Sequence, residues 1–345
     1  MSIPSSQKQW VVTGPGKGLD TLQYGDGEVP KVGENDVLVK FHAASLNYRD
    51  LIIPRGQYPF ATQFPVVAAS DGAGEVVEVG SKVSLWKRGD RVVTLFNQGH
   101  QYGGVSIAAA GTGVGGVVDG TLRQYGAFNE TGLVRAPKNL SYAEAATLTC
   151  AGVTSWNALY GLKSIKPGET VLVQGTGGVS LFALQFAKAA GAKVIATTSS
   201  KDKEEIVKKL GADHVLNYND DQNWGETARQ LTGGAGVDLV IEVGGGNTMQ
   251  QSLKAIKYGG TIAIIGFLGG AKVQSSLLEC LTHICTARGV YVGSRQQMEE
   301  MVAAIEANDI HPYVDSKVFS LEQAKEAYEY QWNKGHVGKI SIKIT

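Results

Sequence analysis

The protein has 345 residues, of which 43% are hydrophobic and 19% charged, and its 32 basic residues equal its 32 acidic residues in number. That length is enough for two hydrophobic cores, so we expect two domains. A formally neutral chain without a basic run lacks the charge pattern of proteins that bind nucleic acid or anionic membranes. We therefore expect a small molecule, and neither nucleic acid nor membrane, as its partner.

Cysteine usage and the first residues indicate the compartment. Cys150, Cys280 and Cys285 are too few and too widely spaced for a disulfide framework. Residues 1–6 contain no apolar signal region, and no apolar run approaches the roughly 20 residues that a membrane helix needs. We expect a cytoplasmic protein in a reducing environment.

The first third of the chain has the pattern of short strands. Apolar and polar residues alternate over residues 36–44 and 74–80, and a third candidate strand, 89–95, follows a turn. Short strands joined by glycine turns are typical of a partly closed barrel. Residues 97–120, which are rich in glycine and alanine, are predicted to form a loop.

Two helices are expected before the next strand. Ser141 and Glu144 fit a capping box, in which each side chain accepts a hydrogen bond from the backbone N–H of the other residue at a helix start. That helix leads towards Cys150, and a second helix is predicted for residues 153–162.

A glycine-rich turn follows at residues 175–178, between an apolar strand and a helix. Residues 171–173 suit a buried parallel strand, and the apolar spacing after Val179 predicts a helix packed on the sheet. Gly175 permits a sharp turn. Gly177 and Gly178 carry no side chain that would keep a pyrophosphate from the N–H groups at the helix N-terminus. Ser180 replaces the third glycine of the dinucleotide fingerprint G-x-G-x-x-G, so the surrounding pattern has to support the motif.

The surrounding pattern is a repeated alternation of strands and helices. Strands are predicted at 171–174, 193–198, 214–217, 237–243, 261–266 and 289–293, and helices at 179–190, 202–210, 224–231, 247–257 and 274–286. This is the α/β pattern of a doubly wound parallel sheet, with expected strand order 3-2-1-4-5-6 and a ligand at the carboxyl ends of the strands. A glycine turn that serves packing alone is the weaker interpretation. Helices at 296–308 and 321–332 and a strand at 339–345 are expected to return to the first domain.

Six segments together resemble the medium-chain dehydrogenase/reductase superfamily, and most of all its zinc-free quinone oxidoreductase-like branch. They are residues 47–50, 71–76, 86–92, the glycine turn, 210–213 and 337–340. The resemblance implies a GroES-like β-barrel catalytic domain, residues 1–135 completed by 295–345, and an inserted Rossmann domain, 136–294. It also implies a homodimer, with a sheet edge near residues 261–270 as a candidate pairing site. Residues 47–50 are similar to enoyl-reductase modules of polyketide synthases as well.

The resemblance also shows where the zinc of related alcohol dehydrogenases would bind. Those positions hold Asn47, Ser70 and Cys150 here. An amide and a hydroxyl are poor zinc ligands, so one thiol remains where three protein ligands are required. The family's structural zinc needs four cysteines, and residues 97–120 contain none. We expect no metal.

The end of the second sheet strand indicates the cofactor. NAD-specific sites usually place an acidic residue there, whereas this chain has Thr198, Ser199 and Ser200 followed by lysines. Hydroxyls and a lysine suit the 2′-phosphate of NADP, and the resemblance places Ser200, Lys203 and Tyr218 around it. Alternatively, the lysines only begin a solvated helix. The full set expected to contact the cofactor is Thr154, Gly175, Gly177, Gly178, Val179, Ser199, Ser200, Lys203, Tyr218, Gly244, Gly266, Phe267, Gly293 and Ser294.

Asn47, Tyr48 and Arg49 are the expected catalytic residues, since the resemblance places them where the family binds substrate. A hydride acceptor needs donors that stabilise developing negative charge. We expect an electrophilic substrate, either a quinone or an α,β-unsaturated carbonyl, whose oxygen Asn47 or Tyr48 would hydrogen-bond. Tyr48 would supply the proton, or it would only shape the site. Cys150 is expected to line the pocket rather than act as a nucleophile. An enoyl-thioester reductase and a non-catalytic NADPH-binding sensor remain as alternatives.

Overall fold

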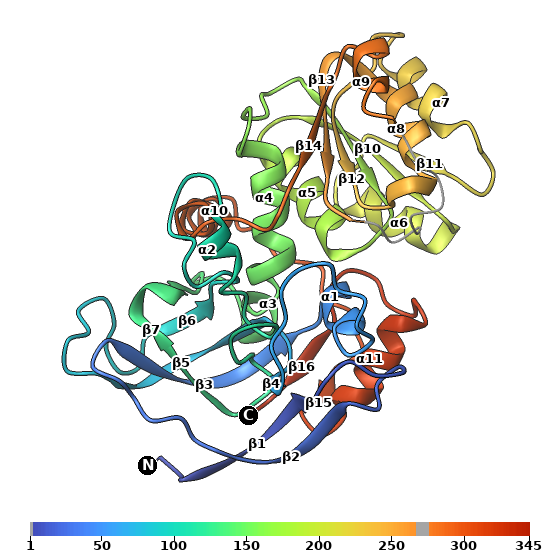
Figure 1. Ribbon diagram of the computed structural model, residues 1–345. Coiled ribbons are helices and arrows are strands. Elements are labelled where there is room, and N and C mark those ends of the chain that lie inside the picture. Colours follow the sequence, from blue (N-terminus) through green and yellow to red (C-terminus); the bar gives the residue numbers. More distant parts are fainter. Residues whose placement is uncertain (1–2, 267–275) are drawn as a thin grey trace. The chain divides into compact units, whose positions relative to one another are not determined.

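The computed structural model describes residues 3–266 and 276–345 and divides the chain into two compact units (Figure 1). The barrel unit comprises Met1–Val153 and Gly293–Thr345, and the sheet unit comprises Thr154–Val292. The first boundary lies after the expected position, residue 135. The reason is that helix α3 (Tyr142–Ala145) contacts β3 and β5, and the π-helical turn η2 (Leu148–Gly152) contacts β5 and β6, all strands of the barrel unit.

The barrel unit contains two sheets. The larger has the order β15-β16-β3-β5-β6-β8, with β7 also pairing with β3, and the smaller has the order β2-β1-β4. The strands of the larger sheet are β3 (Asp36–Ser45), β5 (Asp71–Val79), β6 (Arg91–Thr94), β7 (Tyr125–Asn129), β8 (Leu133–Arg135), β15 (Phe319–Ser320) and β16 (Ser341–Lys343). Those of the smaller are β1 (Ser6–Val12), β2 (Leu22–Glu28) and β4 (Val66–Val67).

Strand β3 is the centre of the larger sheet. Val37, Val39 and Phe41 alternate along it and pack into one apolar cluster with Val76 and Val92. Two register shifts between β3 and β5 bend the pair, as bulges do in strongly curved sheets. β16 pairs antiparallel with β3, so the C-terminal segment completes this unit as expected.

Short helices and one irregular segment fill the rest of the barrel unit. The helices are α1 (Tyr48–Ile52), α2 (Ile107–Ala110), α3, α10 (Arg295–Ala307) and α11 (Ala324–Trp332), and η1 (Glu130–Gly132) is a 3-10 turn. The predicted capping box between Ser141 and Glu144 is present at α3. The segment predicted as a loop, 97–120, is irregular apart from α2. A bridge between Asn97 and Gly113 closes this segment on itself, and buried Val114 packs into the apolar cluster of the barrel.

The sheet unit has the predicted strand order. Its six strands lie in the order β11-β10-β9-β12-β13-β14 and all pair in parallel, which confirms the order 3-2-1-4-5-6 (Figure 1). The strands are β9 (Thr170–Gln174), β10 (Lys193–Thr198), β11 (His214–Asn217), β12 (Val237–Glu242), β13 (Ile256–Ile264) and β14 (Thr286–Gly289). The helices are α4 (Val153–Tyr160), α5 (Gly178–Ala189), α6 (Lys201–Lys209), α7 (Trp224–Leu231), α8 (Met249–Ala255) and α9 (Glu279–Thr282), with the 3-10 turn η3 (Gly245–Asn247).

Several details of the last two strands differ from the prediction. β13 begins at Ile256 rather than 261, because a register shift against β12 lets the strand continue through Gly259, whose φ is +78°. β14 ends at Gly289 instead of beginning there. Of the helix expected at 274–286, α9 covers Glu279–Thr282, and residues 274 and 275 lie outside the described residues.

The sheet edge expected near 261–270 is a further correction. β13 pairs with β12 on one side and β14 on the other, so residues 261–264 are internal to the sheet, and residues 267–270 lie outside the described residues. The edges of the described sheet are β11 and β14. None of the helices in the described parts of the chain has both the length and the apolar character needed to cross a membrane.

Candidate active site

Asn47 lies at the N-terminus of α1 and is held there by its neighbours in the barrel unit. Its backbone N–H donates to the carboxylate Oδ2 of Asp50 at 2.8 Å, and its side chain is largely buried. Its Oδ1 accepts from the Lys339 ammonium at 2.5 Å, while its Nδ2 lies 3.5 Å from Ser70 Oγ. The amide is thus fixed at both ends, as a substrate-binding donor would need to be.

Tyr48 is the first residue of α1 and is half-buried. Its ring packs against the apolar cluster that includes Leu51 and Tyr328. This packing fixes the ring within the barrel unit, and both the steric role and the proton-donor role considered for Tyr48 stay predictions.

Arg49 has its guanidinium buried inside the barrel unit. It donates to the backbone carbonyl of Val114 at 3.0 Å and lies 3.3 Å from the Asp50 carboxylate. Its charge centre is 5.0 Å from the Tyr58 ring centroid and 4.7 Å from that of Phe96. Burial alone disfavours the charge, but Tyr58 and Asp50 outweigh it and raise the pKa of Arg49. Arg49 thereby ties α1 to the irregular segment 97–120.

The buried Asp50 carboxyl and the half-buried Cys150 thiol complete this region. Burial raises the pKa of the Asp50 carboxyl to about 6, Arg49 opposes that rise, and the nearby Asp71 adds to it. Burial, with a contribution from Asp71, raises the pKa of the Cys150 thiol to about 12. A thiol with that pKa stays protonated at neutral pH, which fits a lining role and not a nucleophilic one.

The donor set does not fit zinc. The residues that the structure describes contain no group of three or more His, Cys, Asp or Glu side chains able to hold a metal ion. At the three positions that the resemblance assigns to zinc ligands, Asn47 Oδ1 already accepts from an ammonium, Ser70 Oγ donates to Asp71 Oδ1 at 2.7 Å, and Cys150 alone carries a thiol. Zinc requires deprotonated thiolate or free imidazole and carboxylate ligands.

In the sheet unit, the glycine turn has the geometry of an anion-binding helix start. Gly175 has φ +72°, and its N–H donates to Thr197 O at 2.8 Å. Gly177 is the N-cap of α5 without a side-chain cap, and no atom lies within 4 Å of where its Cβ would be. The first N–H groups of α5, from Gly178 and Val179 onward, therefore have no side-chain cap from residue 177, as at the helix starts that bind phosphate. Ser180 Oγ donates to Gln174 O at 2.6 Å, so this residue packs the helix on the strand as its small size predicted.

The ends of β10 and β11 bring the predicted phosphate-binding residues together. Tyr218 N donates to Thr198 O at 3.0 Å, and the Asn219 side chain donates to Ser199 O at 2.8 Å. Ser200 is the N-cap of α6 without a side-chain cap bond, and Lys203 lies in the first turn of that helix. No side chain that the structure describes forms an ion pair with Lys203, and Tyr218 is partly exposed.

A buried network joins β9 and β12 at the switch point of the sheet. Glu242, the last residue of β12, accepts hydrogen bonds from Gln174, Ser252, Thr248 and the backbone of Gly244 and Gly245. Gln174 Oε1 in turn accepts from Val243 N and Gly244 N. Gly244 therefore helps to shape the loop at the carboxyl end of β12, and its N–H is already bonded to Gln174 and Glu242.

The remaining predicted cofactor residues fall in several places. Gly266 follows β13, and a Cβ there would come within 2.7 Å of the Val243 carbonyl oxygen, so only glycine fits. Thr154 is buried in the first turn of α4. Phe267 lies outside the described residues. Gly293 and Ser294 do not end a sheet strand as predicted, because β14 ends at Gly289; they begin α10 in the barrel unit, where Ser294 Oγ accepts from Gln297 N.

Three buried residues of these regions were not singled out from the sequence: Gln174, Glu242 and Lys339. Glu242 could have been noticed, since a carboxylate that ends an apolar strand must find partners when it is buried. Lys339 lies in a segment that resembled the family, but its partner Asn47 is 292 residues away in the chain. Nothing local predicts that contact.

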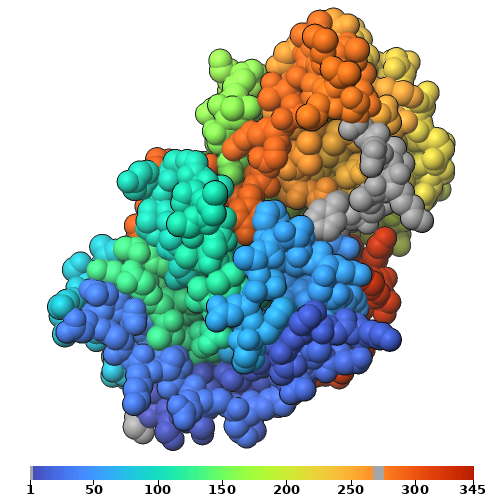
Figure 2. Space-filling model, in the orientation of Figure 1, coloured from blue at the N-terminus to red at the C-terminus, as the bar shows by residue number. Residues whose placement is uncertain are grey.

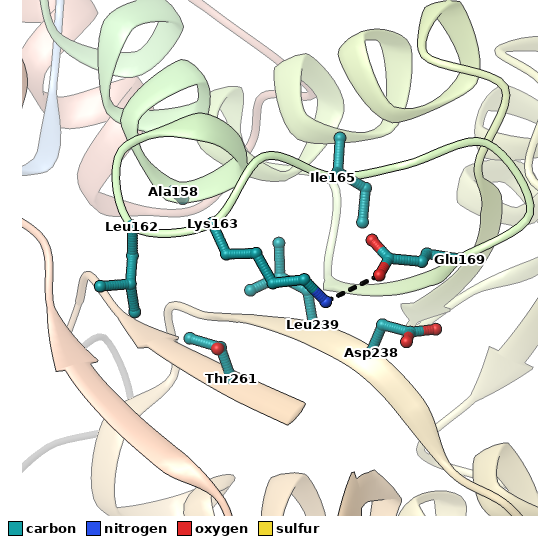
Figure 3. Close-up of a pocket in the computed structure, with 8 residues that line it drawn as sticks. All are labelled: Ala158, Leu162, Lys163, Ile165, Glu169, Asp238, Leu239 and Thr261. Atoms are coloured by element: carbon teal, nitrogen blue, oxygen red, sulfur yellow. Dashed lines mark hydrogen bonds and ion pairs between the residues drawn. The ribbon is translucent and has the colours of Figure 1, made fainter. Parts of the chain in front are cut away.

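Two hollows of the described surface lie away from these residues. One of about 20 Å³ in the sheet unit lies at the amino ends of the strands, between Glu169 and Asp238, with the Lys163 ammonium 2.9 Å from the Glu169 carboxylate (Figure 3). Ligands of open α/β sheets bind at the opposite, carboxyl ends. A larger hollow of about 340 Å³ lies beside Trp86 and α10 in the barrel unit, and none of the predicted site residues lines it.

Comparison with known proteins gives two family matches and many relatives. Residues 33–138 match the alcohol dehydrogenase GroES-like domain, and residues 178–307 match the zinc-binding dehydrogenase family. A zinc-type alcohol dehydrogenase-like protein of Schizosaccharomyces pombe is 48% identical over 97% of this chain and 99% of its own. The crystal structure of a putative alcohol dehydrogenase from Sinorhizobium meliloti superposes with a TM-score of 0.90 at 37% identity, covering 99% of this chain and all of that one.

Reductases are among the relatives as well. Acryloyl-coenzyme A reductase of Sulfurisphaera tokodaii is 30% identical over 97% of this chain and 99% of its own. The structure of a quinone oxidoreductase from Pseudomonas syringae has a TM-score of 0.82 at 25% identity, covering 98% of this chain and 99% of that one. These full-length similarities, the GroES-like barrel and the parallel dinucleotide-type sheet confirm the expected fold and the family's nicotinamide-nucleotide chemistry. The chain belongs to the medium-chain dehydrogenase/reductase superfamily, with relatives in its quinone oxidoreductase-like branch.

Proposed function

We propose that this oxidoreductase is a zinc-independent, NADPH-dependent reductase that transfers hydride to a quinone or an α,β-unsaturated carbonyl. The observation that carries the proposal is the Asn47 amide, held by Lys339 at a position where related dehydrogenases would bind zinc. An oriented amide N–H₂ stabilises negative charge on a substrate oxygen without a metal. The reductases among the relatives support the same reaction class.

The residues of the chain would divide the reaction between them. A bound NADPH supplies the hydride. Asn47 would hydrogen-bond the carbonyl oxygen, so that when hydride adds to the β-carbon the C=C electron pair moves towards an oxygen whose negative charge is stabilised. Tyr48 or water would then return a proton to the α-carbon. Arg49 would act indirectly, because its buried guanidinium holds α1 against the segment 97–120.

We propose NADPH rather than NADH because the end of β10 carries donors and no acid. Ser199 and Ser200 follow the strand, and Lys203 lies one turn into α6. An acidic residue there would repel a 2′-phosphate, whereas hydroxyls and an ammonium attract it. Asp202 and Glu204 lie in the same first turn of α6 and reduce its positive potential. Acidic residues are favourable at any helix N-terminus, so their presence there needs no role in cofactor binding.

Two other functions remain testable on the same site. An enoyl-thioester reductase would use the same residues on a thioester substrate. The acryloyl-coenzyme A reductase among the relatives is named for such a substrate. A sensor would bind NADPH and turn over no electrophile. Both differ from the proposed reductase in substrate and not in fold.

NADPH oxidation, followed by absorbance, tests the proposal against enones, quinones and enoyl thioesters with a strong chelator present throughout. We expect turnover of quinones or enones that the chelator does not change, and weaker turnover with NADH. Loss of turnover on chelation would refute zinc independence. Tight NADPH binding with no turnover of any substrate would replace the reductase by the sensor, and preference for thioesters would identify the enoyl-thioester reductase.

We also propose a homodimer formed through β14. Among the described strands β14 pairs only with β13, and Leu277, Leu278, Leu281 and Ile284 beside it are 85%, 72%, 75% and 56% exposed (Figure 2, orange). A second copy would extend the sheet at this edge and cover the apolar side chains. We expect a dimer mass by light scattering and a monomer for Leu281→Lys. A wild-type mass of 36.5 kDa would contradict the proposal.

We further propose a cytoplasmic location. All three cysteines are free thiols, which suits a compartment that keeps thiols reduced. Fractionation of cells that produce the untagged protein would place it in the soluble cytoplasmic fraction if this is right, and in a membrane or exported fraction if it is wrong.

A further inference from the structure

We propose that Lys339 is a positioning residue of the reductase: its ammonium takes the electrostatic place of a metal ion and turns the Asn47 amide so that its N–H₂ group faces the substrate oxygen. This inference rests on the proposed function, in which Asn47 binds that oxygen. It goes further by assigning a role to a residue distant in sequence and by explaining how the site works with an amide where a metal ligand would be.

Four side chains form a closed ring of hydrogen bonds in the barrel unit. Lys339 Nζ donates to Asn47 Oδ1 at 2.5 Å and to Asp71 Oδ2 at 3.3 Å. Ser70 Oγ donates to the other Asp71 oxygen at 2.7 Å, and Asn47 Nδ2 donates to Ser70 Oγ at 3.5 Å. Lys339 makes a third bond to the carbonyl of Leu46 at 2.6 Å. All four ring members are buried, and Asp71 and Ser70 are fully so.

The ring fixes which end of the amide points where. An ammonium can only donate, so the Asn47 atom that faces Lys339 must be the carbonyl oxygen. The N–H₂ group is then forced to the opposite side. Ser70 Oγ donates its one hydrogen bond to Asp71 and therefore can only accept from Asn47. Every bond in the ring thus has one possible direction. Without the ammonium both orientations of the amide become accessible.

The longest bond of the ring is the one that a substrate would use. At 3.5 Å the contact from Asn47 Nδ2 to Ser70 Oγ is at the limit of a hydrogen bond, whereas the bond on the other side of the amide is 2.5 Å. Asn47 therefore has donor capacity left for a substrate oxygen. The ammonium polarises the amide towards a stronger N–H donor, since bonds in a chain reinforce one another in a low-dielectric interior.

The charges of this region leave no place for a metal ion beside the two cationic side chains that it already holds. The buried groups are the cations Lys339 and Arg49 and the carboxyls Asp71 and Asp50, which balance one another. A zinc ion placed against Asn47 would meet the ammonium at the same oxygen. Lys339 thus supplies one fixed positive charge at the position where the resemblance would put a zinc ion, and the ring explains why these residues do not fit the zinc for which the matching dehydrogenase family is named.

Steady-state kinetics of Lys339→Met and Lys339→Arg test the role, with Lys188→Met as the matched control because Lys188 pairs with Asp213 in the sheet unit. For Lys339→Met we expect kcat to fall by about 10- to 100-fold, less than the roughly 100- to 1,000-fold seen when an oxyanion donor is itself removed, because Asn47 remains present; the KM for NADPH should be unchanged. Lys339→Arg also only donates and should restore most of kcat. If Lys339 merely stabilises the fold, Lys339→Met will melt earlier yet keep the kcat of the wild type, which overturns the proposal.

The double variant Asn47→Ala/Lys339→Met separates action through Asn47 from independent action. A positioning residue that works through Asn47 adds almost nothing once Asn47 is gone, whereas independent effects multiply. We expect the double variant to be as slow as Asn47→Ala alone. A further loss comparable to that of Lys339→Met by itself would contradict the proposal.

A spectroscopic measurement keeps the ring testable even if no substrate is turned over. In protein labelled with ¹⁵N asparagine, the side-chain N–H₂ signals of Asn47 are identified by their loss in Asn47→Ala. We expect slow hydrogen exchange of these protons in the wild type and in Lys339→Arg, and fast exchange in Lys339→Met. Identical signals in all three proteins would refute the ring, whereas absent turnover with the expected signals would refute only the proposed reaction.

Discussion

The two proposed binding regions arrange their polar groups in opposite ways. In the barrel unit, Asn47, Ser70, Asp71 and Lys339 satisfy one another through side chains, and one long bond is left to a ligand. In the sheet unit, the start of α5 presents backbone N–H groups with no side chain to cap them. The first region would bind a substrate oxygen through one oriented hydrogen-bond donor. The second would bind a phosphate through several backbone N–H groups and the positive end of the helix dipole. The comparison teaches that an orienting site needs distant residues, while an anion site needs only a local turn.

The largest predicted effect concerns the network that shapes the anion site. Glu242→Gln replaces a carboxylate that accepts five hydrogen bonds with an amide that can accept on one side only. Buried donors left without partners should lower the free energy of unfolding by about 3 kcal/mol. Urea denaturation measures it, with Glu205→Gln, an exposed glutamate, as the control. Equal stability of the two variants would show that the hydrogen bonds of Glu242 do not stabilise the carboxyl ends of β9 and β12.

Gly177→Asp should separate stability from affinity. Asp is a good N-cap residue, and the Cβ of residue 177 would meet no atom within 4 Å, so stability should stay within a few tenths of a kcal/mol. Its carboxylate would repel the cofactor phosphates, and we expect the Kd for NADPH to rise by about 100-fold. Titration calorimetry measures it, with Gly14→Asp, also in open space, as the control. Unchanged affinity would mean that the pyrophosphate does not bind at α5.

Lys203→Met tests the proposed 2′-phosphate contact, which also lies in the sheet unit. Loss of one half-buried charge should weaken NADPH binding by about tenfold, near 1.4 kcal/mol, and leave NADH binding unchanged. Lys209→Met at the other end of α6 is the matched control. A parallel loss for both nucleotides would assign Lys203 to something other than the 2′-phosphate.

The smallest predicted effect is a pH dependence in the barrel unit. Burial raises the pKa of Asp50 to about 6 from 3.8, so folding favours its protonated form. The stabilisation this brings is present at low pH and is lost as pH rises through about 6. Between pH 7 and pH 5 the wild type should gain about 1 kcal/mol relative to Asp50→Asn, measured by denaturation at each pH. A constant difference between the two proteins would place the Asp50 pKa outside that window.

The same contrast explains how much could be predicted from the sequence. The strand order, the positive φ of Gly175 and the open N-terminus of α5 follow from patterns within a few residues, and the sequence contained those patterns. The partner of Asn47 lies 292 residues further along the chain, and that of Arg49 is a carbonyl in an irregular segment. Such contacts depend on the closed barrel and have no local signal.

The errors in the sheet unit have a similar cause. Residues 289–293 look like a strand because Val290, Tyr291 and Val292 are apolar, but the sheet partner of β13 is the preceding segment, Thr286–Gly289. Ser294 was assigned to the cofactor by its position after that expected strand. In the structure its hydroxyl caps α10, a role that its sequence neighbour Gln297 indicates through the capping-box spacing.

The pairing of β16 with β3 has a consequence for the order in which the protein is made. Lys339 and β16 leave the ribosome after all of the sheet unit. Until then β3 pairs with β5 and β7, but its residues 43–45 lack the pairing with β16, and the Asp71 carboxylate, which Ser70 already contacts, lacks its ammonium partner. The nascent barrel therefore exposes part of a strand edge and a carboxylate without its cation throughout translation of the middle of the chain, the interval in which chaperone capture matters most.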